Sequence, residues 1–366
     1  MLIIDGDYPM SYGAIEKQRD LTLPIDQVRA RTWGGHASDE WHDEGVMASL
    51  PEMRNARIAV ALVKIVSCVR RPGHAHGDVE TDVHSYASGQ GQIGYYRILE
   101  EMEETRLLKS RGEFVEHMAR WLEATEYDGL PVGMVLGMEG ADPITRPQQV
   151  HGWYESGLRV ISLSHYGVSR YSHGTGTGTD GGLLPGAKEL LREMDSLSMV
   201  LDVSHTSDES VRQELDLFTG PVLSSHQNCR TLCPGERQMP DDLLERIIER
   251  GAVIGHSMDT YMIWPHESDW ANIPAKRPFA VEDVTLEDYV NHIDHISQLA
   301  GNSLHSAIGG DTDGQGGADG APFEIDTVAD YQKIADILDR RGYKQEDIEN
   351  VMYRNWQRFF EAALPE

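Results

Sequence analysis

The chain has little positive charge and few cysteines. Its 366 residues include 60 acidic and 32 basic side chains, which gives a formal net charge of −28 at pH 7. Proteins that bind nucleic acid through its phosphates carry a basic surface, so this charge argues against such a partner. The only cysteines are Cys68, Cys229 and Cys233. So small and odd a number excludes a disulfide-stapled scaffold and favours reduced thiols in the cytoplasm.

Long hydrophobic runs are also missing. The longest apolar stretch, Arg57–Val69, is interrupted by Lys64 and is too short to cross a bilayer. The opening residues contain no basic region followed by a long apolar segment, so we expect no signal peptide and no membrane partner. With 40% hydrophobic and 25% charged residues, the composition is typical of an ordinary globular protein.

Eight short apolar runs alternate with amphipathic stretches. Most runs are rich in Val, Ile and Leu and are bounded by Gly, Pro, Asp or Ser, a pattern typical of parallel strands buried on both faces. The runs are Leu2–Ile4, Ile58–Val69, Val132–Met138, Arg159–Leu163, Met199–Val203, Pro221–Leu223, Ala252–Ile254 and Ser306–Ile308. Helices are predicted over Arg97–Glu126 (one or two), Gly186–Ser196, Asp208–Leu217, Asp241–Arg250, Leu286–Ala300 and Val328–Arg341.

This alternation predicts an α/β fold, a (β/α)₈ TIM barrel in one domain over residues 1–366. A doubly wound open sheet is the competing fold. Long insertions are predicted at about residues 10–56, 70–96 and 259–285, and segments of that length are usually functional or partly helical. The connections after the strands build the active site of a barrel, so these segments are candidates for its walls or for a subunit interface.

Polar residues stand at the ends of five apolar runs. They are Glu139, His165, His205, His226 and Asp311. In a barrel these side chains converge on one mouth, where two imidazoles and a carboxylate make a suitable ligand set for Zn²⁺. The sequence therefore predicts Glu139, His205 and His226 as metal ligands and Asp311 as general base and acid. A single histidine at a strand end is more often a loop residue, so the joint placement carries the prediction.

Three motifs in this order resemble the membrane (renal) dipeptidase family of zinc metallopeptidases. They are Asp202–His205 (DVSH), Pro221–His226 (PVLSSH) and Gly309–Gly314 (GGDTDG). The resemblance covers nearly the whole chain and is weakest between residues 10 and 130. It implies an amidohydrolase-like TIM barrel of the metal-dependent hydrolase type, with a binuclear zinc centre.

The resemblance also implies roles for the metal residues. Glu139 matches the carboxylate that bridges both ions, and His205 and His226 match the histidines that hold one of them. Asp311 matches the aspartate that handles protons at the attacking water.

Two further residues match positions that bind the substrate. His165 corresponds to a residue that orients the tetrahedral intermediate, and Arg237 to one that orients the substrate carboxylate. The implied reaction is hydrolysis of a dipeptide, often with a D-residue at its C-terminal position, by attack of a zinc-bound hydroxide. The planar guanidinium of Arg237 would recognise the free carboxylate.

The opening motif departs from the family. The family begins Asp-Gly-His-x-Asp, where the His and the second Asp hold the other metal ion, whereas this chain has Asp5–Pro9 (DGDYP). Asp7 either replaces the His or, after a two-residue deletion, matches the second Asp. Three outcomes stay open: one zinc ion on the three ligands named above, two ions with Asp7 and His74 or His76 as new ligands, or loss of peptidase activity.

We therefore expect a zinc-dependent dipeptidase in the cytoplasm that acts on a small dipeptide or amide and holds one zinc ion, with two as the alternative. A homodimer is expected because family members are often dimers. The alternative functions are hydrolysis of another amide or ester, such as an N-acyl amino acid or a lactone, and non-catalytic binding of a small molecule. Arg237 favours the dipeptidase, whereas the missing opening His favours the non-catalytic barrel. Buried histidines and carboxylates are costly without a metal ion, which argues against the latter.

Overall fold

Parallel strands form the centre of the molecule. The computed structural model describes residues 1–32, 45–71, 78–176, 178, 181–266, 279–313 and 318–366. The strands of the barrel in this part of the chain are β1 (Ile3–Tyr8), β2 (Ile58–Val66), β4 (Val132–Glu139), β5 (Leu158–Ile161), β6 (Val200–Asp202), β7 (Val222–Leu223), β8 (Ile254–His256) and β9 (Ser306–Ile308). Each lies within or overlaps one of the eight predicted apolar runs.

The sheet curls until its two ends meet. Strands β1, β2, β4, β5, β6 and β7 lie side by side in this order, and β8 pairs with β9. A bridge between Ser224 and Ile254 joins β7 to β8. The backbone N–H of Asp311, just after β9, donates to the carbonyl oxygen of Asp7 in β1 at 3.1 Å. The predicted (β/α)₈ barrel is confirmed, and the doubly wound sheet is wrong.

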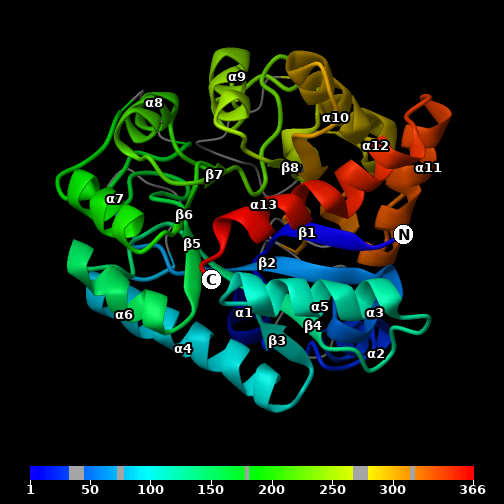
Figure 1. Cartoon of the computed structure of the whole chain (residues 1–366), viewed down its shortest axis with the longest axis horizontal. Coiled ribbons are helices and arrows are strands. Elements are labelled where there is room, and N and C mark those ends of the chain that lie inside the picture. The colour runs from blue at the N-terminus through cyan, green and yellow to red at the C-terminus, as the bar shows by residue number, and fades with distance from the viewer. Residues whose placement is uncertain (33–44, 72–77, 177, 179–180, 267–278, 314–317) are drawn as a thin grey trace.

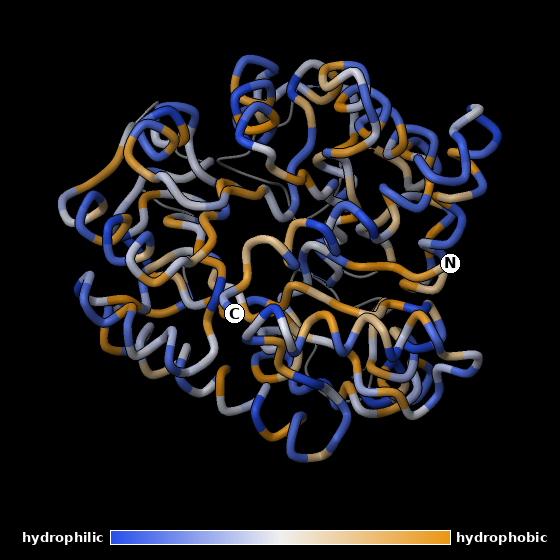
Figure 2. The backbone as a smooth tube through the Cα atoms, in the orientation of Figure 1, coloured by the Kyte–Doolittle hydropathy of each residue, from blue (hydrophilic) through white to orange (hydrophobic). Residues whose placement is uncertain are grey.

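Helices surround the strands (Figure 1). They are α1 (Met10–Glu16), α2 (Ile25–Thr32), α3 (Leu50–Ala56), α4 (Asp82–Glu101), α5 (Arg111–Glu123), α6 (Val150–Glu155), α7 (Ala187–Ser196), α8 (Asp208–Leu217), α9 (Asp241–Glu249), α10 (Leu286–Ala300), α11 (Gln332–Arg340), α12 (Gln345–Glu349) and α13 (Asn355–Ala363). Figure 2 shows polar segments at the periphery and hydrophobic segments on the strands. None of the described helices has the length and apolar character needed to span a membrane.

The predicted helical stretch Arg97–Glu126 needs correction. Helix α4 begins earlier, at Asp82, where Thr81 caps its first turn, and it ends at Glu101. The short strand β3 (Thr105–Leu107) then pairs with β4 before α5 begins. Three residues are too few to show a strand period in the sequence.

The three predicted insertions contain regular structure where they are described. The segment 10–56 holds α1, α2 and α3, and the segment 70–96 holds the first part of α4. The segment 259–285 includes two short 3₁₀ turns, Thr260–Met262 and Val281–Asp283. The assignment of the whole chain to one domain stays a prediction.

The closure of the barrel depends on glycines. A Cβ atom on Gly255 or on Gly309 would lie 2.0 Å from the carbonyl oxygen of Ser225. Strands β8 and β9 therefore approach the end of β7 more closely than a side chain permits. This approach places the segments that carry His226 and Asp311 next to each other.

We expect Gly255→Ala to lower the free energy of unfolding by about 2 kcal/mol or more, because the backbone must move to admit a methyl group. The control is Gly94→Ala in α4, where an added Cβ meets nothing within 4 Å. This change should raise the free energy of unfolding by about 0.5 to 1 kcal/mol, since alanine favours a helix. Urea denaturation measures both, and equal stabilities would contradict the close approach.

Candidate metal centre

Three ligand atoms converge where the strands end. Glu139 is the last residue of β4, while His205 and His226 follow β6 and β7. The Oε1 atom of Glu139 lies 3.0 Å from Nε2 of His205 and 3.3 Å from Nε2 of His226. The two Nε2 atoms are 2.8 Å apart. The structure therefore brings the three predicted metal ligands together, and all three are buried.

Neighbouring polar groups contact one ring nitrogen of each imidazole, whereas Nδ1 of His205 has no hydrogen-bond partner among the described residues. The Nδ1 atom of His226 lies 3.0 Å from Oδ1 of Asp7. The Oγ atom of Ser225 lies 2.8 Å from the same Nδ1. Burial opposes a charge on His226, but Asp7 and Asp311 outweigh it and raise the pKa of this imidazole, so a metal ion would compete with a proton there. The Nε2 atom of His205 accepts from Nη2 of Arg237 at 3.1 Å. The one lone pair of this nitrogen is therefore engaged by Arg237 in the structure, and a bound ion would take the place of that hydrogen bond.

These three atoms fit a bound cation. The two Nε2 atoms and the carboxylate oxygen lie within 3.3 Å of one another, so one cation could contact all three. Zinc binds nitrogen and oxygen ligands at about 2.0 to 2.2 Å, which separates tetrahedral ligand atoms by roughly 3.3 Å. The donor set and its spacing both match a transition-metal ion.

The surroundings shift the pKa values of the other two ligands, His205 and Glu139, in the direction that metal binding favours. Burial, together with the nearby charge of Arg237, lowers the pKa of His205 well below its usual value, so this imidazole is neutral. Burial alone would raise the pKa of Glu139, but His165, His226 and Lys64 outweigh it and lower the pKa. Glu139 is therefore an anion.

Two of the site residues have a left-handed backbone. The φ angle is +64° at His205 and +52° at Asp311. Non-glycine residues rarely adopt this conformation, and strained residues of this kind cluster at functional sites. The backbone here turns sharply to aim both side chains at the barrel mouth.

Asp311 lies at the rim of the metal centre. The Oγ atom of Ser257 donates to its Oδ2 at 3.4 Å. Burial raises the pKa of Asp311 to about 8. The charge of His226 opposes this shift, whereas the negative charges of Asp7 and Glu139 add to it. A bound cation would lower this pKa again. A carboxyl group that titrates near neutral pH suits proton transfer.

His165 lies next to the ligands on the open side. Its ring centre is 4.4 Å from that of His205, and its Nε2 atom is 3.9 Å from Oε1 of Glu139. The side chain is 22% exposed, so it faces the entrance.

Arg237 is buried with uncharged partners. Its Nη1 atom donates to Oε1 of Gln227 at 3.1 Å, and Nη2 donates to the carbonyl oxygen of His226 at 3.1 Å. Its Nε atom has no partner, and no carboxylate pairs with Arg237 within the described ranges. A buried guanidinium with a donor still free suits a charge-assisted contact with a ligand carboxylate.

Asp7 lies beside the cluster but is in contact with a lysine. Its carboxylate is within 4.8 Å of ligand atoms of Glu139 and His226, so these three residues form a second grouping. The Nζ atom of Lys64, however, lies 2.9 Å from Oδ1 of Asp7. A lysine ammonium at this oxygen does not fit a second metal ion. The two histidines that we considered as extra ligands, His74 and His76, lie outside the described residues.

Three neighbours of the cluster carried no role in the sequence interpretation. Lys64 and Asp202 form a buried ion pair with 2.7 Å between Nζ and Oδ2. The ring of Tyr166 packs edge-on against that of His205, with centres 4.6 Å apart. Lys64 alone had a sequence signal, because it is the one charge in the buried strand Ile58–Val66.

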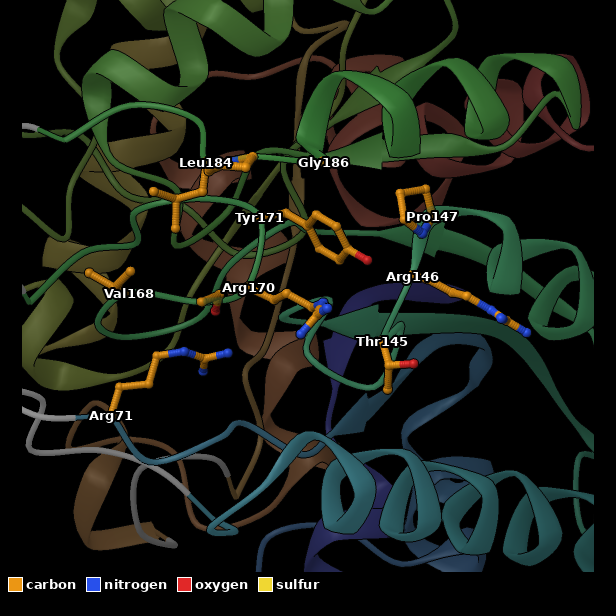
Figure 3. A pocket seen from close by; sticks show the side chains of 11 residues that line it. Arg71, Thr145, Arg146, Pro147, Val168, Arg170, Tyr171, Leu184 and Gly186 are labelled. Atoms are coloured by element: carbon orange, nitrogen blue, oxygen red, sulfur yellow. The ribbon is translucent and has the colours of Figure 1, made fainter.

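A separate pocket of about 570 Å³ opens beside the segments that follow β4 and β5 (Figure 3). Arg71 and Arg170 line it, but both are already paired. Arg71 lies 2.9 Å from Asp142, and Arg170 contacts Asp82. None of the candidate metal or substrate residues lines this pocket. The metal chemistry therefore belongs to the barrel mouth.

Known proteins resemble this chain over most of its length. A family model described as membrane dipeptidase (peptidase family M19) matches residues 44–364. An uncharacterized dipeptidase of Schizosaccharomyces pombe is 28% identical over 235 residues, which cover 63% of this chain and 53% of that protein. The chain spans about half the length of most curated relatives that it matches.

Two solved structures share the fold. The structure of dipeptidase AC, described as a metallopeptidase of family M19, has a TM-score of 0.77 and 18% identity, and the match covers 100% of this chain and 99% of that one. A metallopeptidase from Rhodobacter sphaeroides, bound to a phosphinate mimic of the dipeptide L-Ala-D-Ala, has a TM-score of 0.76 and 18% identity, with 99% of each chain covered.

We expect Zn²⁺ to raise the unfolding temperature of the protein, because an ion that binds the folded state stabilises it by about 2.7 kcal/mol at a hundred times its Kd. His205→Asn should abolish most of this rise, since it removes a ligand atom. His151→Asn, at an exposed ion pair on α6, is the control and should leave the rise unchanged. A thermal melt with and without Zn²⁺ measures the effect, and an equal rise in all three proteins would place the ion elsewhere.

Proposed function

Since the chain belongs to the membrane dipeptidase family, peptidase family M19, we propose that it is a dipeptidase that uses one zinc ion held by Glu139, His205 and His226. The observation that carries the proposal is the convergence of their three ligand atoms within 3.3 Å. The family match confirms the resemblance that the sequence motifs indicated. Zinc is proposed because two imidazoles and one carboxylate leave a position open for a catalytic ligand.

The bound ion would supply Lewis acidity, which activates water at neutral pH and polarises the carbonyl group of the peptide bond. We assign the proton transfers to Asp311, which would accept a proton from the attacking water and pass it to the leaving amine. His165 lies on the open side of the ligands, where it would donate to the oxygen that gains negative charge.

Arg237 would bind the substrate through its free carboxylate. The guanidinium is buried beside His205 and has no carboxylate partner among the described residues. A charge-assisted contact in such a place is strong and fixes the distance from the carboxylate to the reacting bond. This requirement favours dipeptides over esters or lactones that lack a carboxylate.

A dipeptide with a C-terminal D-residue is the proposed substrate class. The related Rhodobacter sphaeroides structure holds a mimic of L-Ala-D-Ala, which supports this choice. We also propose a reducing compartment such as the cytoplasm, because all three cysteines are free and buried. The homodimer stays a prediction.

Turnover of dipeptides by the zinc-loaded protein tests the proposed function. We expect hydrolysis of L-Ala-D-Ala and of its L,L counterpart, loss of activity with a chelator and recovery on addition of Zn²⁺. Release of product from neither dipeptide by the zinc-loaded protein would contradict the proposal.

We expect Asp311→Asn to lower kcat on dipeptides at least a hundredfold, because the amide neither accepts nor returns the proton. Zinc content should stay unchanged, since Asp311 is not among the three proposed ligands. Steady-state kinetics and elemental analysis measure the two quantities. Loss of zinc in the variant would instead make Asp311 a ligand.

We expect Arg237→Ala to lower kcat/KM for a free dipeptide about thirtyfold, which corresponds to about 2 kcal/mol for a charge-assisted contact. The matched substrate is the same dipeptide with its C-terminus converted to an amide. The wild-type protein should have a much lower kcat/KM for this amide than for the free dipeptide, and Arg237→Ala should hardly change the value for the amide. Equal losses on both substrates would place carboxylate recognition at another residue.

A further inference from the structure

Lys64 is a charged residue inside the barrel. It lies within β2, a strand of nine buried residues, and its side chain is 0% exposed. Lysine is almost never buried in this way unless it is paired. The sequence of β2 therefore places one positive charge close to the proposed metal centre.

Three oxygen atoms surround the lysine nitrogen. The Nζ atom lies 2.9 Å from Oδ1 of Asp7, 2.7 Å from Oδ2 of Asp202 and 3.0 Å from Oγ of Ser225. The ammonium group donates hydrogen bonds to Asp202 and Ser225 and forms an ion pair with Asp7. Burial opposes its charge, but Asp202 and Asp7 outweigh burial and raise the pKa of Lys64. Without the lysine, the two carboxylates and the hydroxyl group would supply three oxygen ligands for a metal cation.

Asp7 connects this lysine to the metal ligands. Its Oδ1 atom contacts both Nζ of Lys64 and Nδ1 of His226, at 2.9 and 3.0 Å. The Oγ atom of Ser225 lies 2.8 Å from the same Nδ1, so Asp7 and Ser225 together contact this side of the imidazole and leave Nε2 on the side of Glu139. A carboxylate behind a ligating histidine in this way sets its orientation and basicity.

A second ion does not fit beside this lysine. The grouping of Asp7, Glu139 and His226 offers ligand atoms within 4.8 Å of one another. An ion there would share Asp7 with the ammonium group, and two cations at one buried carboxylate repel each other strongly. The residues that the structure describes therefore do not match the binuclear centre that the family resemblance implies.

We propose that the ammonium group of Lys64 takes the place of a second metal ion, so that the centre binds one ion. Lys64 neutralises Asp7 and Asp202, and Asp7 in turn orients His226. Lys64 and Asp7 are thus positioning residues. This inference rests on the proposed function, because it assumes an ion at Glu139, His205 and His226.

The number of ions in the wild-type protein is the first test. Elemental analysis after Zn²⁺ loading and desalting, together with a Zn²⁺ titration, should give one ion per chain. Two ions per chain would overturn the inference but leave the proposed function intact. No bound ion would overturn the proposed function, and the inference with it.

Removal of the lysine is the second test. Lys64→Ala exposes the oxygen atoms of Asp7, Asp202 and Ser225, so at saturating Zn²⁺ this variant should bind two ions. The double variant Lys64→Ala/Asp7→Asn should return to one ion. Lys333→Ala, which removes a half-exposed surface lysine, is the control and should keep one ion. A Lys64→Ala variant that is folded by circular dichroism and still binds one ion would overturn the inference.

Asp7→Asn keeps the pair of Lys64 with Asp202, so it tests the orienting role even if Lys64→Ala does not fold. This variant should still bind one ion, but 10 to 100 times more weakly, because His226 loses the anion behind it. The visible spectrum of the Co²⁺-loaded protein should change as well, since it reports the ligand geometry. Unchanged affinity and an unchanged spectrum would overturn the orienting role.

Discussion

The buried contact of Lys64 with Asp7 and Asp202 supports the rest of the site. Lys64 comes from β2, Asp7 from β1 and Asp202 from β6, and Ser225 follows β7. The pair with Asp202 therefore crosses the inside of the barrel from β2 to β6, and the pair with Asp7 joins β2 to its neighbour β1. Removing one partner of a buried pair leaves an uncompensated charge, which typically costs about 3 to 5 kcal/mol.

The metal ligands lie next to these ion pairs and depend on them. His226 receives its orientation from Asp7, and Glu139 keeps its negative charge partly because Lys64 is near. His205 stays neutral because it is buried and close to Arg237. One set of charges therefore links strands of the barrel and shifts the pKa values of the proposed metal ligands.

The fold explains how the opening motif can change without loss of the centre. In a (β/α)₈ barrel each strand contributes separate residues to one mouth, so a change in β1 leaves the ends of β4, β6 and β7 in place. Here the altered residue Asp7 keeps a role through its contacts with Lys64 and His226.

The sequence alone determined the eight strands and the residues at their ends, because buried parallel strands are continuous apolar runs and Glu139, His205 and His226 stand where such runs stop. It missed β3, which has too few residues to show a period. The sequence also did not indicate which residues pair with Lys64. The one feature that set Lys64 apart in the sequence was its position within an apolar run. Only the tertiary structure decided that Asp7 faces this lysine, because closure of the barrel brings together strands that are far apart in the chain.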